Sequence, residues 1–230
     1  MIFVTGDLHG ANDIQKLDET HFPDQSEMSK DDFLIISGDF GLVWNNSEKE
    51  SYWRNWLAER NFTTLFVDGN HENHDLLDSY PVKMWKGGKV HFICDSIIHL
   101  MRGQIYQIEG LEFFTFGGGE SIDKLGRTPG ESWWAREMPS WVEYEEGLVN
   151  LEKHNWKVDF VITHECSEKI FTELTRYGVG AFKYKNNLRT FFDELEEKVS
   201  FEKWFFGHYH DQGEIDNQHT LLYQKILRIG

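Results

Sequence analysis

One pattern recurs five times along this chain of 230 residues, and it constrains the fold more than any other feature. Each copy is a short apolar run, followed within a few residues by Asp, Asn or His. Short apolar runs bounded by turn residues are typical of strands that are buried on both faces. The five runs cover residues 2–4, 33–36, 65–67, 160–162 and 204–206.

The polar residues just beyond these runs predict a shared site. They are Asp7, His9, Asp39, Asn70, His71, His164, His208 and His210. In open α/β sheets, ligands bind outside the carboxyl ends of the strands, so five such strand ends can converge on one point. A spacing of two, as in Asp7 and His9, puts both side chains on one side of an extended segment, where they can hold one ion.

The residue types favour metal binding. Imidazole suits zinc, iron, nickel and similar ions, whereas carboxylate and carbonyl oxygens suit harder ions such as manganese. Seven ligands are enough for two metals. A pair of ions about 3.5–4 Å apart can activate water and stabilise both ends of an in-line displacement at phosphorus.

The first part of the chain predicts a parallel sheet. Helices are expected at Asn12–Glu19 and at Ser47–Arg60, with a polar connection at 20–32 and a short helix near Asp75–Ser79. The second helix has Ser47 as its predicted N-cap and Glu50 three residues later, which is the pattern of a capping box. Strands alternating with helices indicate βαβ units. On length alone, one domain or two are possible.

The pattern changes after residue 89. Short apolar runs at 90–93, 97–101, 104–108 and 113–116 predict antiparallel strands of a second sheet. Residues Gly117–Trp141 show no period, and we expect a long loop over the site. The rest predicts three helices and a closing strand or hairpin, at Val142–His154, Glu168–Tyr177, Asn187–Lys198 and His219–Ile229.

Composition limits the partners. A net charge of −16 argues against a broad electrostatic grip on nucleic acid or on an anionic membrane. A phosphorylated substrate remains possible, because bound cations dominate the local field of a metal site. Cys94 and Cys166 are too few for a disulfide framework, and no signal peptide or membrane span is visible. We therefore expect reduced cysteines and a cytoplasmic protein.

Taken together, the polar blocks resemble the calcineurin-like metallophosphoesterase family. That family carries Asp-x-His, Gly-Asp, Gly-Asn-His-Glu/Asp, His and Gly-His-x-His in this order. Here the blocks are Gly6–Gly10, Gly38–Asp39, Gly69–Glu72, His164 and Gly207–His210. Asp-x-His alone is a weak signal, but five blocks in order, each after an apolar run, are specific. The segment from Gly117 to Trp134 resembles one found in bacterial and phage members.

The resemblance implies an α/β fold, a four-layer αββα sandwich of two mixed β-sheets flanked by helices. It implies one domain over 1–230, with a loop insertion at about 117–141, and two divalent ions (Mn, Fe, Zn or Ni). One ion is expected on Asp7, His9, Asp39 and His210. The other is expected on Asp39, Asn70, His164 and His208, with Asp39 bridging. A metal-activated hydroxide would attack phosphorus, while His71 would protonate the leaving oxygen or stabilise the transition state.

The chain departs from one branch of the family. Phosphoprotein phosphatases carry a second Asp and an Arg shortly after Gly-Asp, where this chain has Leu42 and Val43. This argues against a protein Ser/Thr phosphatase. We expect Arg127 in the loop to hold the substrate phosphate instead, with Lys124 as the alternative, because a guanidinium fork fits phosphate oxygens. A surface ion pair is the competing interpretation of Arg127.

The function expected from these observations is hydrolysis of phosphate mono- or diesters on a phosphorylated small molecule or nucleotide. A nuclease of the same fold is an alternative, although the acidic charge argues against long duplex substrates. A non-catalytic scaffold is a third, disfavoured because every ligand and His71 are present. Neither a membrane nor a protein partner is implied. The tryptophans Trp44, Trp133 and Trp134 are expected to be structural. The remaining histidines are expected to be surface or satisfied buried residues: His21, His74, His91, His99, His154 and His219.

Overall fold

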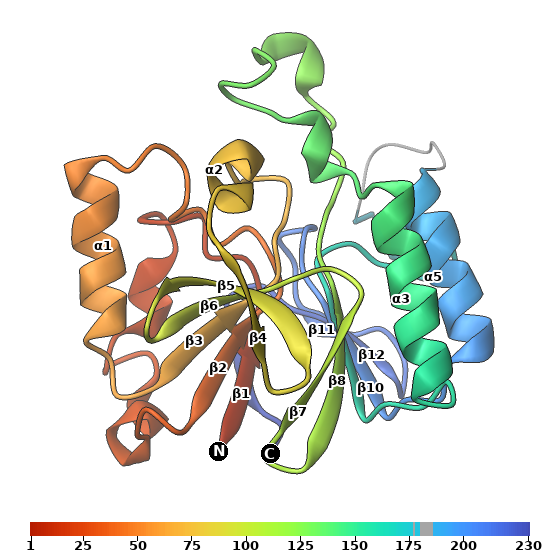
Figure 1. Ribbon diagram of the computed structural model, residues 1–230, viewed down its shortest axis with the longest axis horizontal. Coiled ribbons are helices and arrows are strands. Elements are labelled where there is room, and N and C mark those ends of the chain that lie inside the picture. Colours follow the sequence, from red (N-terminus) through yellow and green to blue (C-terminus); the bar gives the residue numbers. More distant parts are fainter. Residues whose placement is uncertain (177, 180–185) are drawn as a thin grey trace.

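Two mixed β-sheets lie face to face, with helices on both outer sides (Figure 1). This computed structural model describes residues 1–176, 178–179 and 186–230. The four-layer αββα architecture expected from the sequence is confirmed.

The first sheet has seven strands in the order β13-β1-β2-β3-β6-β5-β4. Strands β1, β2, β3 and β6 run parallel to one another, while β13, β5 and β4 pair antiparallel. Their bounds are β1 Ile2–Thr5, β2 Phe33–Ile36, β3 Thr63–Phe66, β4 Val82–Trp85, β5 Gly88–Cys94, β6 Ile97–Leu100 and β13 Ile226–Arg228.

The second sheet has six strands in the order β11-β12-β10-β9-β8-β7. Its four central strands are parallel, and an antiparallel strand closes each edge. Their bounds are β7 Gln104–Ile108, β8 Leu111–Phe116, β9 Phe160–Thr163, β10 Lys203–Phe206, β11 Gly213–Glu214 and β12 His219–Leu221.

Alternation along the strands divides the core into layers, because successive side chains point to opposite faces of a sheet. In β1, Ile2 and Val4 pack between the sheets, whereas Phe3 packs against the outer helices. The first sheet is covered by α1 Glu48–Ala58 and α2 His74–Asp78. The second is covered by α3 Trp141–Lys153, α4 Glu168–Arg176 and α5 Asn187–Lys198.

The prediction of one antiparallel second sheet after residue 89 was wrong. Strands β5 and β6 belong to the first sheet, where β6 pairs parallel with β3, and only β7 and β8 enter the second. The closing segment is likewise split, since β12 joins the second sheet and β13 the first. Sheet membership depends on long-range packing, which a local apolar pattern does not specify.

Helix ends also differ from expectation. Only a short 3₁₀ helix, Ile14–Leu17, forms within 12–19, and another, Pro23–Glu27, forms within the predicted connection. Ser47 caps α1, but the Glu50 carboxylate accepts from the backbone N–H groups of Trp44 and Asn45 rather than completing a capping box. The predicted helix over 168–177 is α4, and its last predicted residue, Tyr177, lies outside the described residues.

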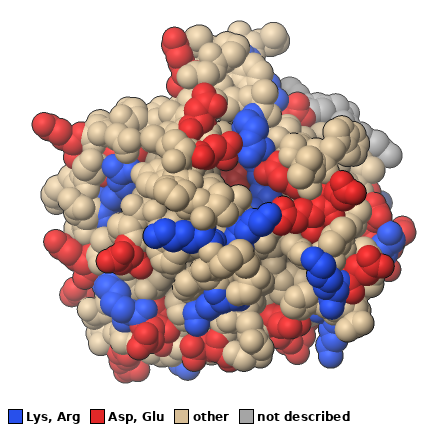
Figure 2. All heavy atoms as spheres, viewed as in Figure 1, with Lys and Arg blue, Asp and Glu red and all other residues tan. Residues whose placement is uncertain are grey.

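The segment from Gly117 to Trp141 follows β8 and projects past the sheets at the top of Figure 1. It contains two 3₁₀ turns, Lys124–Gly126 and Ala135–Glu137. Its start is fixed to the segment that follows β3, because the N–H of Gly118 donates to the carbonyl of Asp68 at 2.8 Å. On the face shown in Figure 2, Lys and Arg are scattered among Asp and Glu.

Candidate metal centre

The five strand ends meet at one edge of the sandwich. Strands β1, β2 and β3 are parallel neighbours in the first sheet, and β9 and β10 are parallel neighbours in the second. Contacts between the two sets of strand ends join the sheets at this edge. The ring Nδ1 of His164 lies 3.0 Å from the carbonyl oxygen of Ser37, and the N–H of His208 donates to the Asp7 carboxylate at 3.1 Å.

One group of ligand atoms comes from Asp7, His9, Asp39 and His210, which lie within 4.8 Å of one another. The Nε2 atoms of His9 and His210 face each other at 3.1 Å. Carboxylate oxygens of Asp39 and Asp7 lie 3.3 Å and 3.6 Å from these nitrogens. Two imidazoles and two carboxylates that converge in this way make a donor set suited to a divalent transition metal.

A second group surrounds the Nε2 atom of His164. It lies 3.1 Å from Asn70 Oδ1, 3.3 Å from Asp39 Oδ1 and 3.1 Å from His208 Nδ1. The Ser37 carbonyl can only accept, so Nδ1 of His164 carries a hydrogen, and Nε2 is the ring nitrogen that could bind a metal. Two acceptor oxygens and two imidazole nitrogens that converge in this way also fit a cation, once the nitrogens that face it are deprotonated.

A protein-family model described as calcineurin-like phosphoesterase matches residues 1–212. The chain belongs to the calcineurin-like phosphoesterase family. Membership indicates a metal-dependent hydrolase that acts on phosphate esters, and the group of Asp7, His9, Asp39 and His210 could bind metal. No curated protein matches the phosphoesterase, so the comparisons name no substrate. In the described part of the chain, no helix has the length and apolar character needed to span a membrane.

Four of the predicted ligand residues have a left-handed backbone, which is uncommon outside glycine. The φ angles are 47° at His9, 44° at Asp39, 72° at His208 and 49° at His210. Such conformations cost free energy and cluster at functional sites, where the surrounding structure holds them. Here they turn the chain sharply after β1, β2 and β10, so that side chains from successive positions reach the same space.

Three glycines that directly precede a predicted ligand leave room for the side chain of another predicted ligand. A Cβ atom placed on Gly69 would lie 2.1 Å from Asp39 Oδ1, and one on Gly207 would lie 2.0 Å from Asp7 Oδ1. A Cβ on Gly38 would meet the His164 ring at 2.1 Å. These three Gly-ligand pairs therefore each bring one predicted ligand close to a predicted ligand from another strand.

The electrostatics of the site favour a cation. Burial alone would lower the pKa of His9, but the carboxylates of Asp39 and Asp13 outweigh it and raise that pKa to about 9. The pKa of His164 is raised as well, because Asp39 and Asp7 oppose the effect of burial. Protons held in this way are displaced when a metal binds, since imidazole must be neutral to act as a ligand.

Residues that support the ligands were missed by the sequence analysis. Asp13 Oδ2 lies 2.7 Å from His9 Nδ1 and orients that ring, as carboxylates behind metal-binding histidines commonly do. Glu72 is fully buried and accepts from the N–H groups of Phe40 and Gly41, which fixes the turn beside Asp39. The four-residue spacing of His9 and Asp13 was the one available signal.

His71 lies beside the ligands and lines a cavity of about 370 Å³. Its backbone N–H donates to Asp39 Oδ1 at 2.8 Å, and its ring packs edge-to-face on the ring of His9 at 5.5 Å. Burial lowers the pKa of His71 despite the nearby Asp39 charge, and the Arg127 charge contributes in the same direction. The ring can donate a hydrogen bond in either protonation state.

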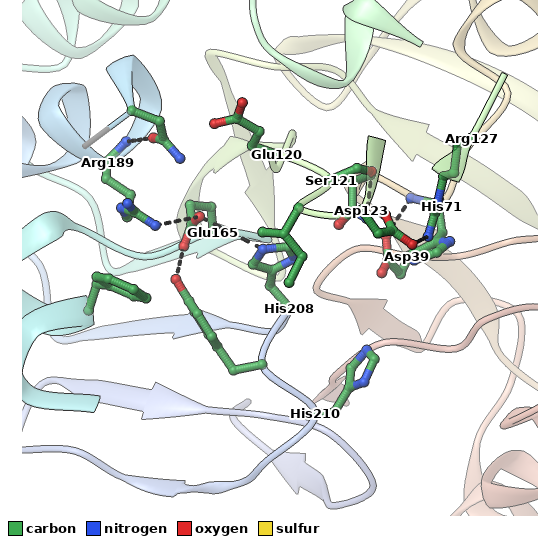
Figure 3. Close-up of a pocket in the computed structure, with 15 residues that line it drawn as sticks. Asp39, His71, Glu120, Ser121, Asp123, Arg127, Glu165, Arg189, His208 and His210 are labelled. Carbon is green, nitrogen blue, oxygen red and sulfur yellow. Dashed lines mark hydrogen bonds and ion pairs between the residues drawn. The ribbon is translucent and has the colours of Figure 1, made fainter. Parts of the chain in front are cut away.

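Arg127 also lines this cavity, beside His71 (Figure 3). Its guanidinium pairs with Asp123 at 2.8 Å and donates to the carbonyl of Ser132 at 3.2 Å, and the side chain is 20% exposed. Lys124 is not among the residues that line the cavity. It pairs with the buried Glu137 carboxylate at 2.7 Å, so of the two predicted cations only Arg127 lines the cavity.

The remaining predictions on this region concern packing. Leu42 and Val43, which replace the Asp and Arg of phosphoprotein phosphatases, are buried in the core. Trp44 packs edge-to-face on Trp134 at 5.0 Å, as expected for a structural role. Several of the other histidines are also structural: His99 is buried, with Nε2 3.1 Å from the Asp68 carboxylate.

Proposed function

We propose that the protein is a dinuclear metal-dependent phosphoesterase that acts on small phosphorylated compounds. The observation that carries this proposal is the position of Asp39, whose two carboxylate oxygens face two different ligand groups. Oδ2 lies 3.3 Å from His9 Nε2, and Oδ1 lies 3.3 Å from His164 Nε2. A carboxylate placed between two groups of ligands is suited to bridge two ions.

Asp7, His9, Asp39 and His210 would hold one ion, and Asp39, Asn70, His164 and His208 would hold the other. When bound, the ions would supply a nucleophile from water at neutral pH and compensate the charge of the phosphate. Imidazole and carboxylate donors together suit Mn, Fe, Zn or Ni, and manganese is the ion that we propose to test first.

His71 would donate to the leaving oxygen. It lines the cavity next to the ligand groups without belonging to either of them. Both roles expected from the sequence remain, because a protonated ring can transfer a proton and a neutral ring can stabilise developing negative charge through its N–H. These two roles differ in how strongly they depend on the leaving group.

Arg127 would hold the non-bridging phosphate oxygens. Asp123 and the Ser132 carbonyl orient its guanidinium, and its fork matches phosphate geometry. This arrangement takes the place of the Arg that phosphoprotein phosphatases carry after Gly-Asp, although it comes from a different part of the chain.

The substrate class follows from the cavity. A volume of about 370 Å³ admits a phosphate with a small or nucleotide-sized group attached. Beyond His208 the wall is formed by Tyr209 and Phe171, and acidic side chains, among them Glu120 and Glu165, line it as well. These carboxylates and the net charge of −16 of the whole protein disfavour the binding of long nucleic acid. We therefore rank a nuclease as the second candidate function.

We also propose that the protein works in the cytoplasm. Cys94 and Cys166 are both free thiols, as expected in a reducing compartment.

The proposal is tested by hydrolysis of p-nitrophenyl phosphate and bis-p-nitrophenyl phosphate after chelation, with Mn, Ni, Zn or Mg added back. Activity that requires a returned ion supports it, and the better substrate assigns mono- or diesterase preference. His71→Ala should keep both ions and lose about 10²–10⁴-fold in kcat on phenyl phosphate, with a smaller loss on p-nitrophenyl phosphate if the residue acts as a general acid. His21→Ala is the control, since His21 is exposed on the surface.

Wild-type protein that hydrolyses neither substrate with any of the four ions would overturn the proposal. Equal losses in His71→Ala on both leaving groups would remove the acid role and leave transition-state stabilisation.

A further inference from the structure

A buried hydrogen-bond chain leads from Asn70 into the loop between Gly117 and Trp141. The side-chain nitrogen Nδ2 of Asn70 donates to Ser121 Oγ at 3.2 Å, and Ser121 Oγ donates to Glu137 Oε2 at 2.8 Å. The exposed fractions are 5% for Asn70, 3% for Ser121 and 0% for Glu137. Water therefore has little access to these three side chains, and each depends on its protein partners.

The chemistry of the three groups fixes the direction of this chain. An ionised carboxylate can only accept, so the hydroxyl proton of Ser121 points to Glu137. The lone pairs of Ser121 Oγ are then left to accept, and the group opposite them must be a donor. The Asn70 amide therefore turns its NH₂ toward Ser121, which leaves Oδ1 on the other side, 3.1 Å from His164 Nε2.

Glu137 is held in place by the loop and by Arg102. Its Oε1 accepts from the N–H of Ser121 at 3.0 Å and pairs with Lys124 at 2.7 Å. Its backbone carbonyl accepts from the N–H of Gly119 at 3.1 Å and from the Arg102 guanidinium at 3.3 Å. The fold of the loop thus places one oxygen of this carboxylate against Ser121 and keeps the other one occupied.

We propose that Glu137, acting through Ser121, is a positioning residue that sets the Asn70 amide with its oxygen toward the second metal. This inference rests on the proposed function, because it takes Asn70 as a ligand. An asparagine can present O or N to a metal, and only the oxygen binds a divalent ion. The loop is then part of the metal centre, although it supplies no ligand itself.

The direction of these hydrogen bonds can be reversed by a substitution that keeps the shape of the Glu137 side chain. In Glu137→Gln, the two donors at Oε1, Ser121 N–H and Lys124, retain the amide oxygen at that position. The new NH₂ then takes the Oε2 position and donates to Ser121 Oγ. The Ser121 hydroxyl proton is released toward Asn70, which favours the amide orientation with NH₂ facing the metal.

The readout is the binding of Mn²⁺ at the two positions, measured by calorimetry and by anomalous scattering from crystals equilibrated at graded Mn²⁺ concentrations. For Glu137→Gln we expect the Kd of the ion beside Asn70 to rise about 10–100-fold, the usual effect of losing a group that orients a ligand. The ion held by Asp7, His9 and His210 should keep its Kd within about threefold. A general loss of structure would weaken both sites together.

Glu120→Gln is the matched control. It removes the same charge, and the Glu120 carboxylate pairs with the same Lys124 at 3.2 Å, but the Ser121 hydroxyl donates to Glu137 and not to Glu120. Ser121→Ala interrupts the hydrogen bonds between Asn70 and Glu137, and it should raise the Kd of the same ion. In the double variant, Glu137→Gln should not raise this Kd further than Ser121→Ala alone. Without the Ser121 hydroxyl, no hydrogen bond connects residue 137 to the Asn70 amide.

The outcomes separate this inference from the proposed function. Wild-type protein that binds fewer than two ions overturns the dinuclear centre itself. Two ions in wild type, with an unchanged Kd at the second position in Glu137→Gln and Ser121→Ala, overturn the role of Glu137 alone. If Glu137→Gln does not fold, Ser121→Ala decides, since a wild-type Kd at the second position in that variant refutes the inference.

Discussion

Replacing Gly69 by alanine is the sharpest steric perturbation of the site. The backbone at Gly69 does not have the left-handed φ that excludes other residues, so the effect comes from the added methyl alone. That methyl would lie 2.1 Å from Asp39 Oδ1, which is 1.3 Å short of the 3.4 Å at which ordinary contact begins. It would also lie 2.5 Å from the backbone nitrogen of Asp39, which cannot rotate away.

The turn that carries Asp39 must therefore shift as a unit. Crowding of a well-packed interior costs about 1–3 kcal/mol in the free energy of unfolding. A displacement of about 1 Å at a positioned catalytic group costs about 10²-fold in rate. Asp39 belongs to both ligand groups, so we expect Gly69→Ala to weaken the binding of both ions. We also expect kcat/KM to fall about 10²-fold while the protein stays folded.

The assay combines urea unfolding, Mn²⁺ binding and hydrolysis of p-nitrophenyl phosphate. Gly126→Ala is the control, since a Cβ at Gly126 has no heavy atom within 4 Å, and it should behave as wild type. Gly69→Ala protein that binds both ions and turns over at the wild-type rate would refute the argument that Gly69 makes room for a bridging Asp39.

Two further predictions concern cationic residues. Arg127→Ala should lower kcat/KM by about 10–100-fold, because a charged hydrogen bond to phosphate is lost. The control is Arg176→Ala, on the surface of α4. An unchanged kcat/KM in Arg127→Ala would show that Arg127 does not contact the substrate. Lys16 is buried and donates to three backbone carbonyls at 2.6–3.0 Å. Lys16→Met should therefore lower the free energy of unfolding by at least about 2 kcal/mol. The control Lys198→Met, at an exposed position, should change it by about 0.5 kcal/mol or less. A smaller loss for Lys16→Met in urea unfolding would contradict this account.

Much of the fold could be predicted because burial on both faces requires continuous apolar runs. Phe33–Ile36 forms a strand with the predicted bounds, and α5 has the predicted bounds as well. The ligand residues could be found for a related reason. They directly follow those runs, and parallel strands bring their carboxyl ends to a common edge. The structure gathers all seven predicted ligands, while their metal-binding roles stay predictions.

The rest depends on contacts between distant segments. Strand β6 carries the same kind of apolar run as β7, yet one lies in the first sheet and the other in the second. Ser121 and Glu137 look like ordinary loop residues in the sequence, and only the packed loop shows that they contact Asn70 or each other. Neither case leaves a local period or motif from which it could be inferred.

The central claim, two metal ions bridged by Asp39, is tested most directly by anomalous scattering from a crystal of the wild-type protein soaked with Mn²⁺. We predict two peaks about 3.5–4 Å apart, one on each side of the Asp39 carboxylate. One peak would lie among Asp7, His9 and His210, and the other beside His164. A single peak in the first group, with none beside His164 at saturating Mn²⁺, would contradict the account.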